Sequence, residues 1–380
     1  MNLRYTITAL LFSLSLATFG QKYALEFEGD IISTGIKGNL ILPLMLNKNI
    51  DEEAKKKISD GLVDRNKFGS NLNFNFRYQF NNDYGFVISS QSKFVGEISK
   101  PALDLLLYGN SKYAGELLFL APTALKLFSF TELGVFKYFG DYWLGASLLL
   151  GNNFQEITLN KGEFFTAEDG SYMSLGLDFE HRKSDTSRMG FGAINGIGAA
   201  LSFGYRSDNL KIEVNNLGFI SWNSKSLAVV KKGTYYYDGF AVSDPRNLEE
   251  VFLSESADSV VEEFSNFSKE AYLQNIIGTI NVRWDKNAQW SFVGRYDFSK
   301  YNLPELTAWY SIGKNGSKGK SYFSPSLTIG GYGLYGFGVA HTNTFSKGMK
   351  LEIATRHLQA IVLPKKTNGI SLYIKISKTI

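Results

Sequence analysis

Ten charged residues are the strongest candidates for a functional role, because they lie in segments that alternate between apolar and polar residues. In a strand, successive side chains point to opposite faces, and these charges fall on the face opposite the large apolar residues. In a narrow interior they would pair and hold the walls together, since an unpaired buried charge is costly. In an open interior they would set which solutes pass. The ten are Asp178, Glu180, Arg206, Glu213, Arg283, Arg295, Asp297, Lys350, Glu352 and Arg356.

Residues that could catalyse a reaction or hold a cofactor are few. The chain has no cysteine, which excludes disulfides, a lipoprotein anchor and thiolate chemistry. Its three histidines lie far apart, and no two have the spacing of metal ligands. Gly331, Gly333 and Gly336 match a dinucleotide-binding pattern, but a strand pattern follows them where a helix is required. We therefore expect a protein that is not an enzyme, with no catalytic residue, no metal site and no cofactor.

The composition is typical of a membrane β-barrel. The net charge of +4 is the small difference between 40 basic and 36 acidic residues, so no nucleic-acid partner is expected. Aromatic residues make up 15% of the chain, with 37 glycines and only seven prolines. Mean hydropathy is −0.12, as expected when lipid-facing and interior residues alternate along each strand. No proline-rich or serine-rich linker divides the chain, which predicts a single domain over residues 21–380.

The clearest strand pattern is a hairpin at residues 196–222. In its first arm Ile197, Leu201 and Phe203 share one face, whereas Gly198 and Ser202 lie on the other. A Ser-Asp-Asn turn at 207–209 follows, and a second alternating arm returns. A soluble sandwich would bury the apolar face against a second sheet, and a transmembrane barrel would expose it to lipid.

The beginning of the chain favours the barrel. Residues 1–4 carry positive charge, residues 7–16 form an apolar run, and small residues precede a cleavage position after Gly20. This pattern predicts a cleaved signal peptide over residues 1–20 and export, because the apolar run is shorter than the roughly 20 residues that span a membrane. Alternating segments continue to the end of the chain. We therefore predict an all-β fold, a transmembrane antiparallel β-barrel of about 14 strands (12 to 18) in the outer membrane, where bacterial barrels usually have an even number.

Three segments depart from the strand period and predict helical insertions, near residues 51–62, 99–126 and 244–272. The third carries eight acidic and two basic residues, a segment charge of −6. It fits a docking surface for a basic partner or a divalent ion, and it equally fits a solvated loop helix. The candidate docking residues are Glu249, Glu250, Glu255, Asp258, Glu262 and Glu263.

Three blocks carry a resemblance to a known family: YGNSKYAGELLFL, TELGVFKYFGDYWLGASLLLG and LSFGYRSDNLKIEVNNLGFISW. They resemble a Bacteroidota family of uncharacterised outer-membrane β-barrel proteins, a domain of unknown function. That family is similar to long-chain fatty-acid transporter-like barrels and to type IX secretion-associated barrels. The likeness covers roughly residues 69–380, and its most distinctive part is the block at residues 216–222. It implies a fold and a location, but no catalytic residue and no substrate.

Two functions follow as hypotheses. The first is a passive channel or transporter for small hydrophobic or amphipathic solutes. The second is a non-transporting barrel that docks secretion or cell-surface machinery through its acidic helical insertion. The expected partners are outer-membrane lipid and either a hydrophobic small molecule or a secretion or surface protein. An apolar cavity would favour transport, whereas a lumen filled by ion pairs would favour docking.

Overall fold

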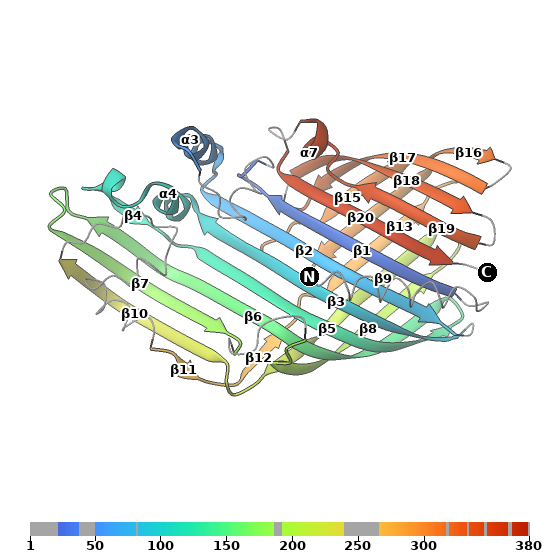
Figure 1. Ribbon diagram of the computed structural model, residues 1–380, viewed down its shortest axis with the longest axis horizontal. Coiled ribbons are helices and arrows are strands. Elements are labelled where there is room, and N and C mark those ends of the chain that lie inside the picture. Colours follow the sequence, from blue (N-terminus) through green and yellow to red (C-terminus); the bar gives the residue numbers. More distant parts are fainter. Residues whose placement is uncertain are drawn as a thin grey trace.

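The chain forms one antiparallel sheet that closes on itself (Figure 1). The structure is a computed structural model that describes residues 22–37, 50–80, 83–185, 192–238, 266–316, 319–332, 334–345, 348–363 and 367–378. Pairing of the first strand with the last, from Tyr23 opposite Lys378 to Ile32 opposite Gly369, completes the ring. The ring has fourteen strands, which confirms the predicted barrel and its even strand number. These are β1 (Lys22–Ser33), β2 (Arg65–Gln79), β3 (Tyr84–Ser99), β5 (Thr123–Phe139), β6 (Tyr142–Thr166), β8 (Gly196–Arg206), β9 (Leu210–Trp222), β13 (Thr279–Asp285), β14 (Trp290–Asp297), β15 (Glu305–Tyr310), β17 (Gly319–Gly330), β18 (Leu334–Phe345), β19 (Met349–Thr355) and β20 (Gly369–Lys378).

The two ends of the barrel differ in their connections. Short turns join β2 to β3, β5 to β6, β8 to β9 and β13 to β14 at one end, which we call the turn end. The first and last strands also have their outer termini there, because Lys22 lies opposite Gln79 and Tyr23 opposite Lys378. The other end, the loop end, carries the helices α3 (Glu52–Gly61), α4 (Lys100–Tyr108) and α7 (Gln359–Val362) and the 3-10 helix η1 (Ser111–Tyr113) (Figure 1). None of the helices in the described part of the chain is both long enough and apolar enough to cross a membrane.

The outward face of the ring is apolar. Along β8 the side chains of Ile197 and Leu201 are 59% and 61% exposed, whereas Ala200 and Ser202 between and beside them are buried. The glycine-rich face of this hairpin therefore points into the barrel. An apolar surface that continues round the ring is the face that contacts lipid in a transmembrane barrel. At the turn end it is bordered by aromatic pairs, which are typical of the membrane interface: Phe80 with Tyr84, Tyr142 with Tyr205 and Trp290 with Tyr310.

Part of the sheet extends beyond the ring at the loop end. Strand β6 has 25 residues, far more than the roughly 10 that cross a bilayer. Its first half pairs with β8, and from Gln155 onward it pairs with β7 (Tyr172–Lys183) instead. We call β4 (Leu117–Phe119), β7, β10 (Leu227–Asp238), β11 (Ser268–Lys269) and the second half of β6 the sheet extension, which projects to the left in Figure 1. Strand β12 (Tyr272–Asn275) brings the chain back to β9, and β16 (Ile312–Gly316) continues β15 along β17.

The loop-end half of the interior is filled by an apolar core. Most of its side chains come from the ring strands, and the others come from the connections before β13 and after β17. They are almost fully buried, and within this core Trp222 and Phe154 lie with 4.7 Å between their ring centroids. The indole N–H of Trp222 donates a hydrogen bond of 2.9 Å to Gln274. Members of this core include Ile32, Val95, Phe128, Phe130, Leu149, Phe154, Ile220, Trp222, Ile276, Ile277 and Tyr332.

The three predicted insertions have different outcomes. Helix α3 lies within the first range, and its N-cap is Asp51, which accepts a hydrogen bond from the backbone N–H of Ala54. The second range is wrong in part: α4 and η1 end by residue 113, and β4 and the beginning of β5 occupy residues 117–119 and 123–126. Periodicity alone does not separate a short apolar run in a strand from one in a helix. Most of the third range, residues 244–265, lies outside the described residues, and its end is strand in β11 and at the beginning of β12.

Candidate functional site

A large cavity enters the barrel from the turn end. Its volume is about 1650 Å³, and its walls come from β1, β2, β9, β13 to β15 and β17 to β20. The wall formed by β15 to β20 is rich in hydroxyl groups, such as Thr307, Ser324, Thr342 and Ser371. A cavity of this size, lined by hydroxyl and charged groups, is a polar vestibule open at the turn end.

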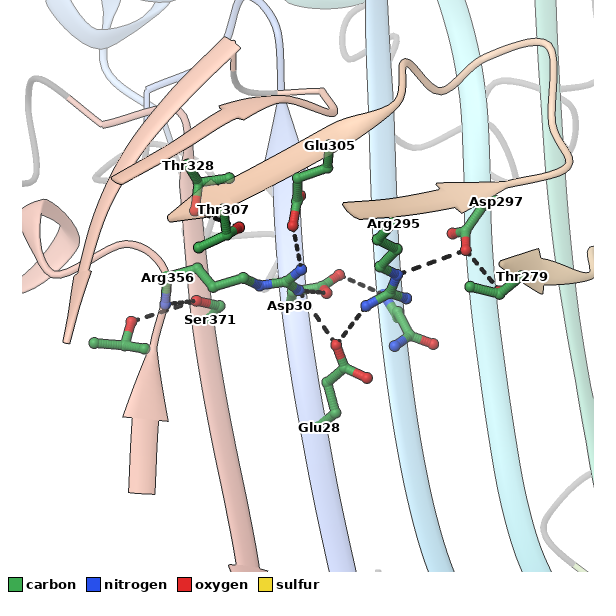
Figure 2. Close-up of polar contacts among 12 residues, drawn as sticks. Glu28, Asp30, Thr279, Arg295, Asp297, Glu305, Thr307, Thr328, Arg356 and Ser371 are labelled. Carbon is green, nitrogen blue, oxygen red and sulfur yellow. Dashed lines mark hydrogen bonds and ion pairs between the residues drawn. The ribbon is translucent and has the colours of Figure 1, made fainter. Parts of the chain in front are cut away.

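The vestibule ends at a layer of charged side chains around Arg356. The guanidinium of Arg356 contacts three carboxylates, with N–O distances of 2.5 Å to Asp30, 2.8 Å to Glu305 and 3.3 Å to Glu28 (Figure 2). Asp30 also accepts a hydrogen bond of 3.1 Å from the backbone N–H of Asn71 on β2. One cation therefore links carboxylates from β1 and β15.

A second group of ion pairs continues the layer. Arg295 on β14 contacts Glu28 at 2.6 Å and Asp297 at 3.7 Å (Figure 2). Asp297 in turn forms an ion pair with the ammonium of Lys93 at 3.3 Å and accepts a hydrogen bond of 2.7 Å from the hydroxyl of Thr279. Charge-assisted hydrogen bonds between largely buried groups are strong and directional, so these groups hold one another in place.

The charge layer crosses the lumen from one wall to the other. We define it as Glu28, Asp30, Lys93, Arg295, Asp297, Glu305 and Arg356. From β1 to β14 the ring passes five strands in one direction (β20, β19, β18, β17 and β15) and seven in the other (β2, β3, β5, β6, β8, β9 and β13). The contact between Glu28 and Arg295 thus joins opposite walls. Four carboxylates and three cations leave the layer with a net charge of −1.

Beyond the charge layer the lumen becomes apolar. A cavity of only about 30 Å³, close to the size of one water molecule, lies between the layer and the ring of Tyr332. Ile32 and Val95 also line it, and with Tyr332 they belong to the buried core of the loop-end half. The described interior is therefore polar on the turn side of the charge layer and apolar on the loop side.

The ten charges taken from the sequence fall into three groups. Arg295, Asp297 and Arg356 belong to the charge layer. The next five line the vestibule, and four of them take part in three ion pairs: Lys211–Glu213 at 3.0 Å, Arg283–Asp285 at 3.0 Å and Lys350–Glu352 at 3.3 Å. These five are Arg206, Glu213, Arg283, Lys350 and Glu352.

The remaining two differ from the expectation. Asp178 and Glu180 lie on β7 in the sheet extension, where they pair with Lys232 at 3.4 Å and Arg182 at 2.6 Å. Alternation shows which face of a strand a residue occupies, but not whether the strand belongs to the ring. The candidate docking residues Glu249, Glu250, Glu255, Asp258, Glu262 and Glu263 lie outside the described residues.

Four members of the charge layer were missed in the sequence. Glu28 and Asp30 lie on one face of the alternating segment at residues 23–33, so their common inward face could have been found. Lys93 lies among small and polar residues that give no contrast between faces, and Glu305 is the first residue of β15. Their contacts with Arg295 and Arg356 depend on strand register across the barrel, which alternation does not encode.

In the described part of the chain, no three histidine, aspartate or glutamate side chains are placed so that they could hold a metal ion together. One histidine, His181, lies on β7 in the sheet extension, where its ring meets that of Phe267 edge to face at 5.4 Å between centroids. Burial, together with the smaller effect of the Lys183 charge, lowers the pKa of His181 to about 4. This histidine is therefore neutral near pH 7.

The closed ring, the apolar outer belt and the polar vestibule define a fourteen-stranded transmembrane β-barrel. No protein-family model and no curated protein matches the chain. A solved structure of a mutant of the monoaromatic hydrocarbon channel TodX is similar over 96% of this chain and 92% of its own, at 10% identity and a TM-score of 0.39. A Pseudomonas aeruginosa FadL homologue is similar over 94% of this chain and 88% of its own, at 9% identity and a TM-score of 0.35. The translocator domain of the autotransporter NalP from Neisseria meningitidis is similar over 99% of this chain and 95% of its own, at 8% identity and a TM-score of 0.32.

Proposed function

We propose that the protein is a passive outer-membrane transporter for a small hydrophobic or amphipathic solute and that the charge layer is its gate. The described lumen is neither an apolar cavity nor filled throughout by ion pairs: it holds an open polar vestibule that ends at one layer of ion pairs. The observation that carries this proposal is the way the vestibule ends. A cavity of about 1650 Å³ stops at side chains from opposite walls, among them Glu28, Arg295, Glu305 and Arg356. Such a layer can open by rotation of side chains, whose motions in proteins are fast compared with rearrangements of the backbone.

The two sides of the gate support an amphipathic solute. A permeating molecule meets hydroxyl and charged groups in the vestibule and then the apolar side chains of Ile32, Val95 and Tyr332. A strongly polar solute would lose its hydration on the apolar side without replacement hydrogen bonds, which is costly. A solute with one polar and one apolar part finds a favourable environment on each side of the gate.

The location is part of the same proposal. We infer that residues 1–20 are a signal peptide cleaved after Gly20 and that residues 21–380 form a single domain in the outer membrane. The short turns and the outer ends of the first and last strands lie at one end of the barrel, and bacterial outer-membrane barrels direct their short turns to the periplasm. The vestibule then opens to the periplasm. We also propose that the protein is a member of the exported Bacteroidota barrel family and that outer-membrane lipid is one of its partners.

Solute flux in proteoliposomes tests transport. Benzenesulfonate and methanesulfonate carry the same permanent charge and differ in their apolar part, so they form a matched pair of probes. We expect the purified barrel to release entrapped benzenesulfonate several-fold faster than protein-free liposomes do, and methanesulfonate more slowly than benzenesulfonate. Release of both probes at the protein-free rate would contradict the proposal.

A second candidate function rests on the sheet extension. The acidic segment near residues 244–272 follows β10 and contains β11, and both strands belong to this extension, outside the ring. We propose as the alternative that the segment docks secretion or cell-surface machinery. Deletion of residues 239–265 should then remove specific proteins that copurify with the barrel. A variant of full length with Glu249, Glu250, Glu255, Asp258, Glu262 and Glu263 changed to glutamine or asparagine separates charge from length. An unchanged set of copurifying proteins in both variants would rule out docking through this segment.

A further inference from the structure

Helix α7 carries an apolar tip that faces away from the protein. Ile361 is 76% exposed, the highest value among the large apolar side chains in the described part of the chain, and Val362 and Leu363 are 66% and 50% exposed. The other two α-helices of the loop end are different, because Ile58 of α3 and Leu107 of α4 are buried in a shared apolar cluster. Contiguous exposed apolar side chains mark a contact surface.

The beginning of α7 is tied to the lipid-facing belt. After β19, the backbone N–H of Leu358 donates a hydrogen bond of 2.7 Å to the carbonyl of Phe337 on β18. The N–H of Phe337 donates one of 2.9 Å to the side-chain oxygen of Gln359. The side chain of Phe337 is 56% exposed, and that of Tyr335, two residues nearer the loop end, is 59% exposed. The helix therefore begins at a level that the outer apolar belt still occupies.

The backbone N–H groups of the tip are hydrogen-bonded within its own turn. In lipid every backbone N–H needs a partner within the protein. The N–H groups of Ile361 and Val362 bond to the carbonyl of Leu358 at 3.0 and 3.3 Å, and that of Leu363 bonds to the carbonyl of Gln359 at 2.7 Å. These donors are satisfied within the turn, so the segment can enter lipid without leaving them unpaired.

We propose that α7 and Leu363 insert into the membrane leaflet at the loop end and contact lipid acyl chains. Phe337 of the apolar belt is hydrogen-bonded to Leu358 and Gln359, and the exposed apolar residues Ile361 to Leu363 follow within one turn, so the tip begins beside the lipid-facing surface of β18. The occupant follows from that position, because the same lipid that covers Phe337 and Tyr335 reaches Ile361. Interfacial segments of this kind bind through the apolar area they bury, and α7 anchors one sector of the loop end to the bilayer.

Site-directed spin labelling tests the insertion, and the chain suits it because it has no native cysteine. Ile361→Cys and Leu363→Cys, each carrying a nitroxide, are reconstituted in lipid bilayers and exposed to oxygen and to a water-soluble nickel chelate. Phe337→Cys is the matched lipid-facing control. Ser171→Cys, an exposed position in the turn between β6 and β7, is the water-facing control.

We expect labels at 361 and 363 to collide with oxygen several-fold more often than with the nickel chelate, as the label at 337 does. Preference for the chelate, as at 171, would overturn the insertion. Protection from both reagents would also overturn it and would indicate that protein covers the tip. The control at 337 reports separately on the transmembrane ring, so a failed anchor is distinguished from a failed barrel.

Discussion

Replacing Arg356 with alanine is expected to raise the ion conductance of the barrel and to lower its stability. The guanidinium is the common partner of Glu28, Asp30 and Glu305, and its loss leaves three carboxylates close together with Arg295 as the nearest cation. Breaking a buried ion pair by removing one partner typically costs about 3–5 kcal/mol. Mutual repulsion of the carboxylates would separate the walls of the gate, and cations would enter the space.

Current through single barrels in planar bilayers measures the opening, and urea unfolding in vesicles measures the stability. Arg283→Ala is the matched control, because Arg283 lies in the vestibule with its side chain 53% exposed and pairs with Asp285 at the rim. We expect Arg283→Ala to leave the conductance and the stability of the barrel nearly unchanged.

Glu305→Gln gives a second test if the alanine variant does not fold. It leaves three carboxylates and three cations in the charge layer, so the layer becomes neutral and Arg356 keeps two partners. We expect a folded barrel whose conductance rises less than that of Arg356→Ala. Wild-type conductance in both variants would show that the charge layer is not a gate.

Much of the ring could be predicted from the sequence because lipid imposes a strict rule on each strand. Every residue on the outer face must be apolar, so the hairpin of β8 and β9 shows its two faces without further information. Ile197 and Leu201 are exposed on one face, and Ser202 is buried on the other. The same rule, repeated to the end of the chain, gave the approximate strand number.

The sheet extension could not be predicted in this way. Strand β6 pairs with β8 up to Gly151, but it continues to Thr166 and exchanges β8 for β7 as its partner. Strand β7 alternates as regularly as a ring strand, although it lies outside the ring. Which strands close a barrel depends on pairing between distant segments, and alternation within one segment does not contain that information.

The distinctive block at residues 216–222 is explained by packing at a similar exchange. Strand β9 pairs with β13 up to Asn215 and with β12 from Phe219, and the register with β8 shifts at the same place. Asn216 has a φ of 62° there, a conformation that few residues other than glycine and asparagine adopt. A Cβ atom on Gly218 would lie 2.1 Å from the carbonyl oxygen of Ala199. The backbone conformation therefore accounts for the asparagine at 216, and the close approach of β8 accounts for the glycine at 218.

Replacing Trp222, the last residue of this block, with alanine is expected to cause the second large loss of stability. Its side chain is 1% exposed, stacks on Phe154 and donates to Gln274. Truncating a buried tryptophan leaves a large cavity and typically costs about 3–5 kcal/mol. The carbonyl oxygen of the Gln274 side chain would also lose its hydrogen bond, which adds a further penalty because the group is buried.

The matched control is Trp284→Ala, the same truncation on the outer face, where the side chain is 46% exposed and packs on Phe292. Urea unfolding in vesicles compares the two, since the midpoint falls with stability when the slope is unchanged. We expect a large fall for Trp222→Ala and a much smaller one for Trp284→Ala. Equal falls would show that the inner core adds no more stability than the lipid-facing belt. The predicted difference would instead mean that the loop-end half of the lumen is held as a packed core, so that a solute passing the charge layer must displace it or leave beside it.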